Sequence, residues 1–159
     1  MDKEMKSRNW YNKLIFKKYR VKKLIYASRY SFKFDGIHEL KQTPVVIKIE
    51  DNLAGHKLLE SEVSFLLLLK GFGIPKVFGF GYSSSCPVMI EEKLGRQISE
   101  FAKNKKLNLK DICMFAIQAL ERLEFVHSKG IIHKDVAPAN FVIGRERPEI
   151  IVCYINFRF

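Results

Sequence analysis

Cysteine is scarce in this sequence. The three cysteines, Cys86, Cys113 and Cys153, are scattered and form no C-x-x-C pair. That spacing is typical of zinc ligands, so no zinc site is predicted. An odd number of distant cysteines also indicates no disulfide framework. We expect reduced thiols that serve in packing.

Long hydrophobic runs are missing as well. The longest, residues 65–69, is far short of the roughly 20 apolar residues that cross a bilayer. The charged N-terminus lacks the apolar stretch of a signal peptide. With 47% hydrophobic residues, the chain is nevertheless apolar enough for a packed core. We therefore expect a protein of the cytoplasm or nucleus with no membrane segment.

Acidic residues are in deficit, with 17 Asp and Glu against 28 Lys and Arg and a net charge of +11. Such a field attracts acidic or phosphate-rich partners. Aromatic residues interleave with the charges near the N-terminus, which is equally typical of an amphipathic element packed on the protein body. We favour a solvated basic face over a nucleic-acid site. The basic residues concerned are Lys3, Lys6, Arg8, Lys13, Lys17, Lys18, Arg20, Lys22 and Lys23.

The order of predicted elements indicates an α+β fold. Residues 19–49 predict strands, and the β-branched run 45–49 is the clearest. Apolar residues at helical spacing predict a helix over 56–69. The later elements are strands over 76–82 and 88–92, helices over 97–104 and 109–128, and strands over 141–143 and 150–155.

The helix over 109–128 has the strongest signals. Asn108 is placed as its N-cap, and Gly130 lies just beyond its end. The apolar positions predicted to face the core are Ile112, Phe115, Ala116, Ala119, Leu123 and Val126.

Residues 133–140 carry the most specific motif. Asp135 and Asn140 stand five residues apart after His133, on a loop that follows an apolar helix. This is the H-x-D-x-x-x-x-N layout of a protein-kinase catalytic loop. There the aspartate accepts the proton of the substrate hydroxyl and the asparagine holds Mg²⁺. Asp and Asn are also common turn formers, so neither residue alone indicates a kinase. The interpretation rests on their combination with His133, the five-residue spacing and the preceding helix.

Lys48 ends the run 45–48, which is similar to the V-A-I-K strand of kinases. A lysine at a strand end is usually just solvated. Here a partner is available, because Glu62 follows fourteen residues later on the predicted helix. Glu60 competes for this role, but Glu62 has the better spacing.

The segments 62–75, 88–95 and 123–140 resemble the casein kinase 1 family of serine/threonine kinases, with the closest matches at 73–75, 125–129 and 135–141. The resemblance covers residues 19–159 and implies a protein-kinase-like fold. The domains that it implies are a basic N-terminal extension (1–18), an N-lobe of β-sheet plus one helix (19–92), and a hinge with the first part of a helical C-lobe (93–159).

The resemblance also implies ATP and Mg²⁺ as cofactors and a protein as substrate or partner. In that family the residue at Asp135 is catalytic. The metal ligands would be Asn140 and Asn156, the latter standing at the D-F-G aspartate position. The residues implied to bind ATP are Ile25, Val46, Lys48, Glu62, Glu92 and Leu94.

The sequence departs from a working kinase in the loop that should cover the phosphates. Residues 25–34 contain no glycine, and Tyr26, Ser28 and Ser31 carry side chains at the glycine positions. Glycine there lets backbone N–H groups approach the phosphates closely. Tyrosine is the hardest of the three to accommodate.

Three further departures concern charge. Asn156 replaces a carboxylate, the ligand that Mg²⁺ prefers. Ala137 replaces a lysine that would steady the γ-phosphate. Glu91 falls behind the adenine, where a buried carboxylate is unfavourable unless it is paired or protonated.

These departures predict a truncated, catalytically impaired homologue that acts as a pseudokinase-like regulatory or interaction module. The alternative is an active ATP- and Mg²⁺-dependent serine/threonine kinase, favoured by Lys48, Glu62, Asp135 and Asn140. A third interpretation is a decayed gene product. A fourth, a basic nucleic-acid-binding domain, rests on net charge alone.

Overall fold

The computed structural model describes residues 7–28, 30–51, 58–71, 73–104, 107–145 and 151–153. The chain divides into two compact units. The first comprises residues 1–63 and 77–93, and the second comprises residues 64–76 and 94–159. Strands dominate the first unit and helices the second, which gives the α+β fold that the sequence predicted. No helix among the described residues is long and apolar enough to cross a membrane.

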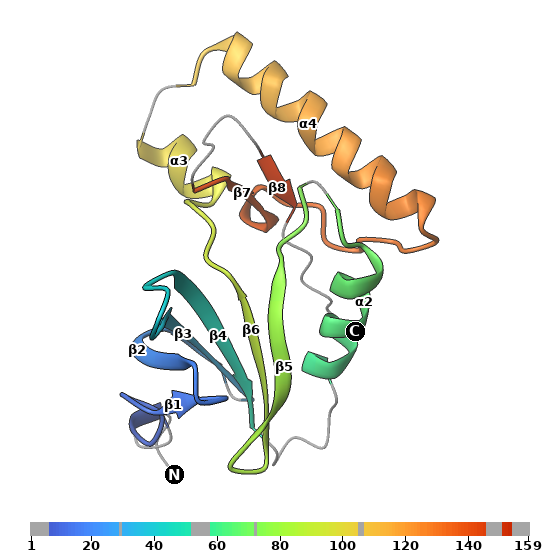
Figure 1. Ribbon diagram of the computed structural model, residues 1–159. Helices are drawn as coiled ribbons and strands as arrows, with labels where there is room; N and C mark the ends of the chain where they lie inside the picture. The colour runs from blue at the N-terminus through green and yellow to red at the C-terminus, as the bar shows by residue number, and fades with distance from the viewer. Residues whose placement is uncertain are drawn as a thin grey trace. The chain divides into compact units, whose positions relative to one another are not determined.

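The first unit is built on a six-stranded antiparallel sheet with the order β1-β2-β3-β4-β6-β5 (Figure 1). All strands expected between residues 19 and 92 are present. Ser84 and Ser85, which join two neighbouring strands of this sheet, both have positive φ. The strands are β1 (Leu14–Ile15), β2 (Tyr19–Ala27), β3 (Ser31–His38), β4 (Pro44–Glu50), β5 (Val77–Ser83) and β6 (Cys86–Glu92).

The sheet has one apolar face and one charged face, because side chains alternate along a strand. Phe34 on β3, Ile47 on β4 and Ile90 on β6 lie in one row of the apolar face and are fully buried. Trp10 and Ile15 belong to the same buried cluster, so the N-terminal segment packs on this sheet. The neighbouring positions on each strand face the other side.

Helix α2 (Leu58–Leu68) follows β4, and its start is held by a carboxylate. Glu50, the last residue of β4, accepts hydrogen bonds from the backbone N–H groups of Leu58 (3.2 Å) and Leu59 (2.8 Å). A negative charge at a helix N-terminus is favourable. The contact therefore ties the first turn of α2 to the strand that carries Lys48. The expected start of this helix at residue 56 lies outside the described residues.

In the second unit, the long predicted helix is confirmed as α4 (Leu109–Ser128). Asn108 and Asp111 form a reciprocal capping box at its start, and Gly130 beyond its end has a φ of 74°. The other elements of this unit are α3 (Ile98–Asn104), the 3₁₀ turn η2 (Pro138–Asn140), and the antiparallel pair β7 (Phe141–Ile143) and β8 (Ile151–Cys153).

The buried stripe of α4 differs from the prediction. Ala119 and Val126 are buried as expected, but Ile112 and Ala116 are exposed. Arg122 takes a buried position between the two, because it packs on Gly73. A Cβ atom on Gly73 would lie 2.2 Å from Arg122 Nε, and its φ of 77° also favours glycine. The packing of this arginine rotates the buried stripe away from the purely apolar row.

Candidate functional site

In the first unit, the lysine and the glutamate that the sequence paired lie in contact. Nζ of Lys48 on β4 is 2.5 Å from Oε1 of Glu62 on α2. Both side chains are largely buried. Glu50 anchors the first turn of α2, which places Glu62 one turn further along, above the strand that carries Lys48. The ammonium group of Lys48 donates a hydrogen bond to Glu62, the glutamate that the spacing favoured over Glu60.

The carboxylate of Glu91 joins this pair from β6. Its side chain is 1% exposed, and its Oε2 lies 3.4 Å from Nζ of Lys48. Its other oxygen, Oε1, lies 3.7 Å from Nζ of Lys33 on β3. The sequence required this buried carboxylate to be paired or protonated, and it is paired with two lysines. We call Lys33, Lys48, Glu62 and Glu91 the charge cluster.

Sequence reasoning missed Lys33. A signal was present, since Lys33 stands two residues after Ser31, the last of the three glycine positions. The G-x-G-x-x-G-x-V pattern of kinases has an apolar residue at that point. Recognising its role also needed the strand register, which places Lys33 opposite Lys48.

Burial and mutual charge shift the pKa values within the charge cluster. Burial, reinforced by repulsion from Lys48, lowers the pKa of Lys33 to about 8, against the opposing attraction of Glu91. Burial alone would lower the pKa of Lys48, but Glu91 and Glu62 outweigh it and the pKa is raised. Burial also raises the pKa of Glu62, despite the attraction of Lys48. The cluster therefore keeps Lys48 charged and makes Lys33 the easier lysine to deprotonate.

The turn between β2 and β3 is closed by serine. Oγ of Ser28 accepts hydrogen bonds from the backbone N–H groups of Tyr30 (3.2 Å) and Ser31 (2.9 Å). The N–H of Ser28 donates to the carbonyl oxygen of Ser31 at 2.8 Å. Tyr26, on β2, is exposed. Three backbone N–H groups at the expected glycine-rich loop thus donate within the turn.

The other residues implied to bind ATP are spread over both units. Val46 is buried on β4 and pairs across the sheet with Glu91. Ile25 is exposed on β2, and Glu92 ends β6 half-buried. Leu94 belongs to the second unit. The structure brings Val46 together with the charge cluster, and the roles of all four residues stay predictions.

In the second unit, Asp135 and Asn140 are bonded to each other. Nδ2 of Asn140 donates to the backbone oxygen of Asp135 (2.8 Å) and to its Oδ2 (2.9 Å). Pro138 opens η2, whose last residue is Asn140, and this turn buries the amide. The five-residue spacing therefore forms a closed loop in which the carboxylate of Asp135 and the amide of Asn140 are hydrogen-bonded to each other.

His133 is a buried residue that contacts this loop. Its ring is 1% exposed and stacks on Phe141, with centroids 6.3 Å apart and planes at 7°. Its Nδ1 accepts the backbone N–H of Asp135 at 3.3 Å. Lys134, between the two, has a φ of 62°, which turns the chain sharply. The histidine orients the aspartate through the backbone.

The oxygen donors of Asp135 and Asn140 are of the type that Mg²⁺ prefers. Within the described part of the chain, no group of three His, Cys, Asp or Glu residues is placed to hold a metal ion. Asn156, the other implied ligand, lies outside the described residues.

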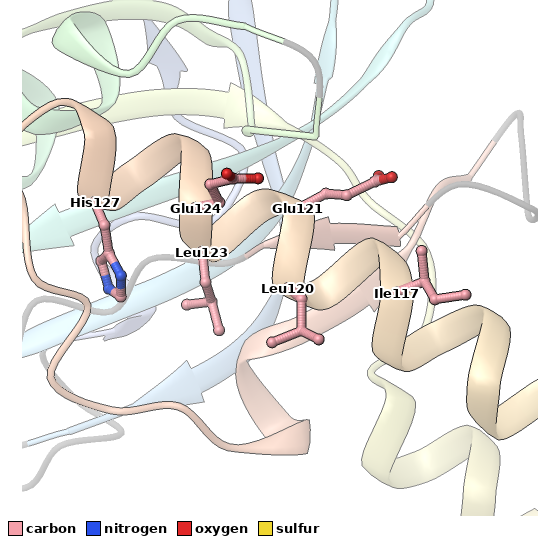
Figure 2. A pocket seen from close by; sticks show the side chains of 6 residues that line it. All are labelled: Ile117, Leu120, Glu121, Leu123, Glu124 and His127. Atoms are coloured by element: carbon pink, nitrogen blue, oxygen red, sulfur yellow. The ribbon is translucent and has the colours of Figure 1, made fainter.

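A pocket of about 540 Å³ lies on α4, away from the loop that holds Asp135. In Figure 2, Leu120, Leu123 and His127 point to one side of the helix, while Glu121 and Glu124 point to the other. Leu120 and Ile117 are mostly exposed. The pocket is a largely apolar helix surface on which Glu121 and Glu124 point away from His127, so we do not assign the chemistry to it.

A comparison with known protein families finds one that matches this chain. A family model described as "Protein tyrosine and serine/threonine kinase" matches residues 24–154. The match spans most of the chain and includes both the charge cluster of the first unit and the loop of Asp135 and Asn140 in the second.

Proposed function

Because the chain belongs to the protein tyrosine and serine/threonine kinase family, we propose that it is a casein kinase 1-like homologue with an impaired catalytic site. It acts as a pseudokinase-like regulatory or interaction module in the cytoplasm or nucleus. Kinase domains act on protein substrates, so its partner is a protein. The resemblance of residues 73–75 and 135–141 to casein kinase 1 supports the subfamily.

One observation supports the proposed impairment: in the turn between β2 and β3, the backbone N–H groups of Ser28, Tyr30 and Ser31 already donate hydrogen bonds within the turn. In active kinases a glycine-rich loop covers the phosphates of ATP. Here the N–H groups of Tyr30 and Ser31 donate to Ser28 Oγ, and that of Ser28 donates to Ser31. A phosphate could be bound by these groups only after bonds within the turn break. Asn156 and Ala137 support the proposal from the sequence.

The retained residues are suited to bind the phosphates and the Mg²⁺ ion of Mg-ATP, the cofactor of the family. Lys48, held by Glu62, would hold phosphate oxygens, and Asn140 would hold Mg²⁺. Bound Mg-ATP supplies the phosphoryl group that kinases transfer. Asp135 would accept the proton of a substrate hydroxyl. These contacts favour the second candidate function, an active serine/threonine kinase.

Phosphorylation of casein by the purified chain separates the two candidates. We expect no Mg²⁺-dependent incorporation of phosphate above that of Asp135→Ala. A casein kinase 1 enzyme serves as the positive control. Incorporation by the wild-type chain that disappears in Asp135→Ala would overturn the proposed impairment and establish the active kinase.

A further inference from the structure

Lys33 and Glu91 lie on either side of the residues implied to contact the nucleotide. The strand register places Lys33 opposite Lys48 and Glu91 opposite Val46. Residues that oppose each other across antiparallel strands share one face of the sheet. Val46 and Lys48 are separated by one residue of β4 and share that face as well. A charged residue therefore flanks the implied nucleotide positions on both neighbouring strands.

The two flanking residues reach each other across β4. Oε1 of Glu91 lies 3.7 Å from Nζ of Lys33, and Oε2 lies 3.4 Å from Nζ of Lys48. One carboxylate thus bridges two lysines from two different strands. Glu91 is almost completely buried, so water does little to screen this contact.

This bridge is incompatible with a base lying on the same face. A nucleotide base presents an apolar ring surface, and the kinase pattern has valine at the position of Lys33. A base at Val46 would separate Lys33 from Glu91, or would bury their charges against the ring. Both outcomes are unfavourable, because a buried charge needs its partner. A phosphate at Lys48 would in addition compete with Glu91 for the same ammonium group.

We propose that the Lys33–Glu91 ion pair occupies the base-binding face of the first unit and keeps Lys48 engaged, so that the chain excludes adenine nucleotides. The inference rests on the proposed function only in taking Lys48 as the nucleotide lysine. It concerns the base, whereas the proposed impairment concerns the phosphates.

Adenosine is the appropriate probe, because it has the base and no phosphate. Its binding is measured by isothermal titration calorimetry on the whole chain, for wild type and for the double variant Lys33→Val, Glu91→Met. We expect the double variant to bind at least about tenfold more tightly than wild type, which corresponds to about 1.4 kcal/mol. Glu39→Met is the matched control, since it removes a paired glutamate from an exposed site. Its affinity should equal that of wild type.

Equal affinity of wild type and double variant overturns the inference, and so does the absence of binding in both. A gain that Glu39→Met reproduces overturns it as well. If the double variant does not fold by circular dichroism, the milder Lys33→Met and Glu91→Gln are judged by the same tenfold criterion. Casein phosphorylation by wild type would refute the proposed impairment. The present inference is decided separately, by the ratio of the adenosine affinities of the double variant and wild type.

Discussion

The turn between β2 and β3 and the loop over residues 133–140 correspond to two motifs of the same family, and they differ in what remains. The loop keeps its aspartate and asparagine, whereas the turn has no glycine. Asn140 also holds the loop together through two hydrogen bonds to Asp135. Ser28 likewise closes its turn. Residues with a structural role can persist without catalysis, so a retained motif is weaker evidence for activity than a lost one is against it.

The charge cluster is a third group of polar residues to set beside the turn and the loop. A change in it is expected to have the largest effect on stability. Glu91→Ala leaves the partly buried Lys33 and Lys48 beside each other without their shared carboxylate. We expect the free energy of unfolding to fall by about 3–5 kcal/mol in urea denaturation. Glu39→Ala, at the exposed pair with Arg20, should have a far smaller effect. Similar losses of unfolding free energy in the two variants would show that the ion pairs of Glu91 do not stabilise the fold more than an exposed ion pair does.

The structural role of the loop is tested by Asn140→Ala. This change removes both hydrogen bonds to Asp135 from a buried position. We expect a loss of about 1–3 kcal/mol in the free energy of unfolding. Asn9→Ala, at an exposed position, is the control and should change little. If Asn140→Ala is as stable as wild type, the structural role that we give to Asn140 is wrong, and a role in catalysis would explain why the asparagine is retained.

Restoring glycine to the turn sharpens the comparison from the other side. In the variant Tyr26→Gly, Ser28→Gly, Ser31→Gly, the bonds to the Ser28 side chain are lost. We expect tighter binding of tripolyphosphate by calorimetry, and a stability loss of about 0.5–1 kcal/mol for each glycine. Tyr30→Gly adds a glycine outside the motif positions and should not improve phosphate binding. A triple variant that binds no better than wild type would contradict the role we give to the turn.

The pH dependence of stability follows a single proton and deletes no contact. The pKa of Lys33 is lowered by burial from 10.5 to about 8. Between these values the unfolded chain binds a proton that the folded chain has released, so Lys33 makes stability rise with pH in this window. The slope from one group is at most about 1.4 kcal/mol per pH unit. Denaturation of Lys33→Met at pH 8, 9 and 10 should lack this contribution, and an identical pH profile would contradict it.

Local patterns made much of the fold predictable. Asn108 and Asp111 stand three residues apart and cap α4, and the β-branched run of β4 formed a strand as expected. Glu62 was found from its spacing to Lys48, since fourteen residues lead from near the end of β4 past the first turn of α2. The stripe of α4 was predicted only in part, because the burial of Arg122 depends on Gly73 in a distant segment.

The sequence by itself determined the family, the order of the elements and the identity of the residues at Lys48, Asp135 and Asn140, because these depend on spacing along the chain. Only the tertiary structure decided what those residues contact. The register of β3, β4 and β6 brings Lys33 to Glu91, and a slip of one residue would turn them to opposite faces. The folded turn likewise decided that the N–H groups of Ser28, Tyr30 and Ser31 are occupied by hydrogen bonds within the turn.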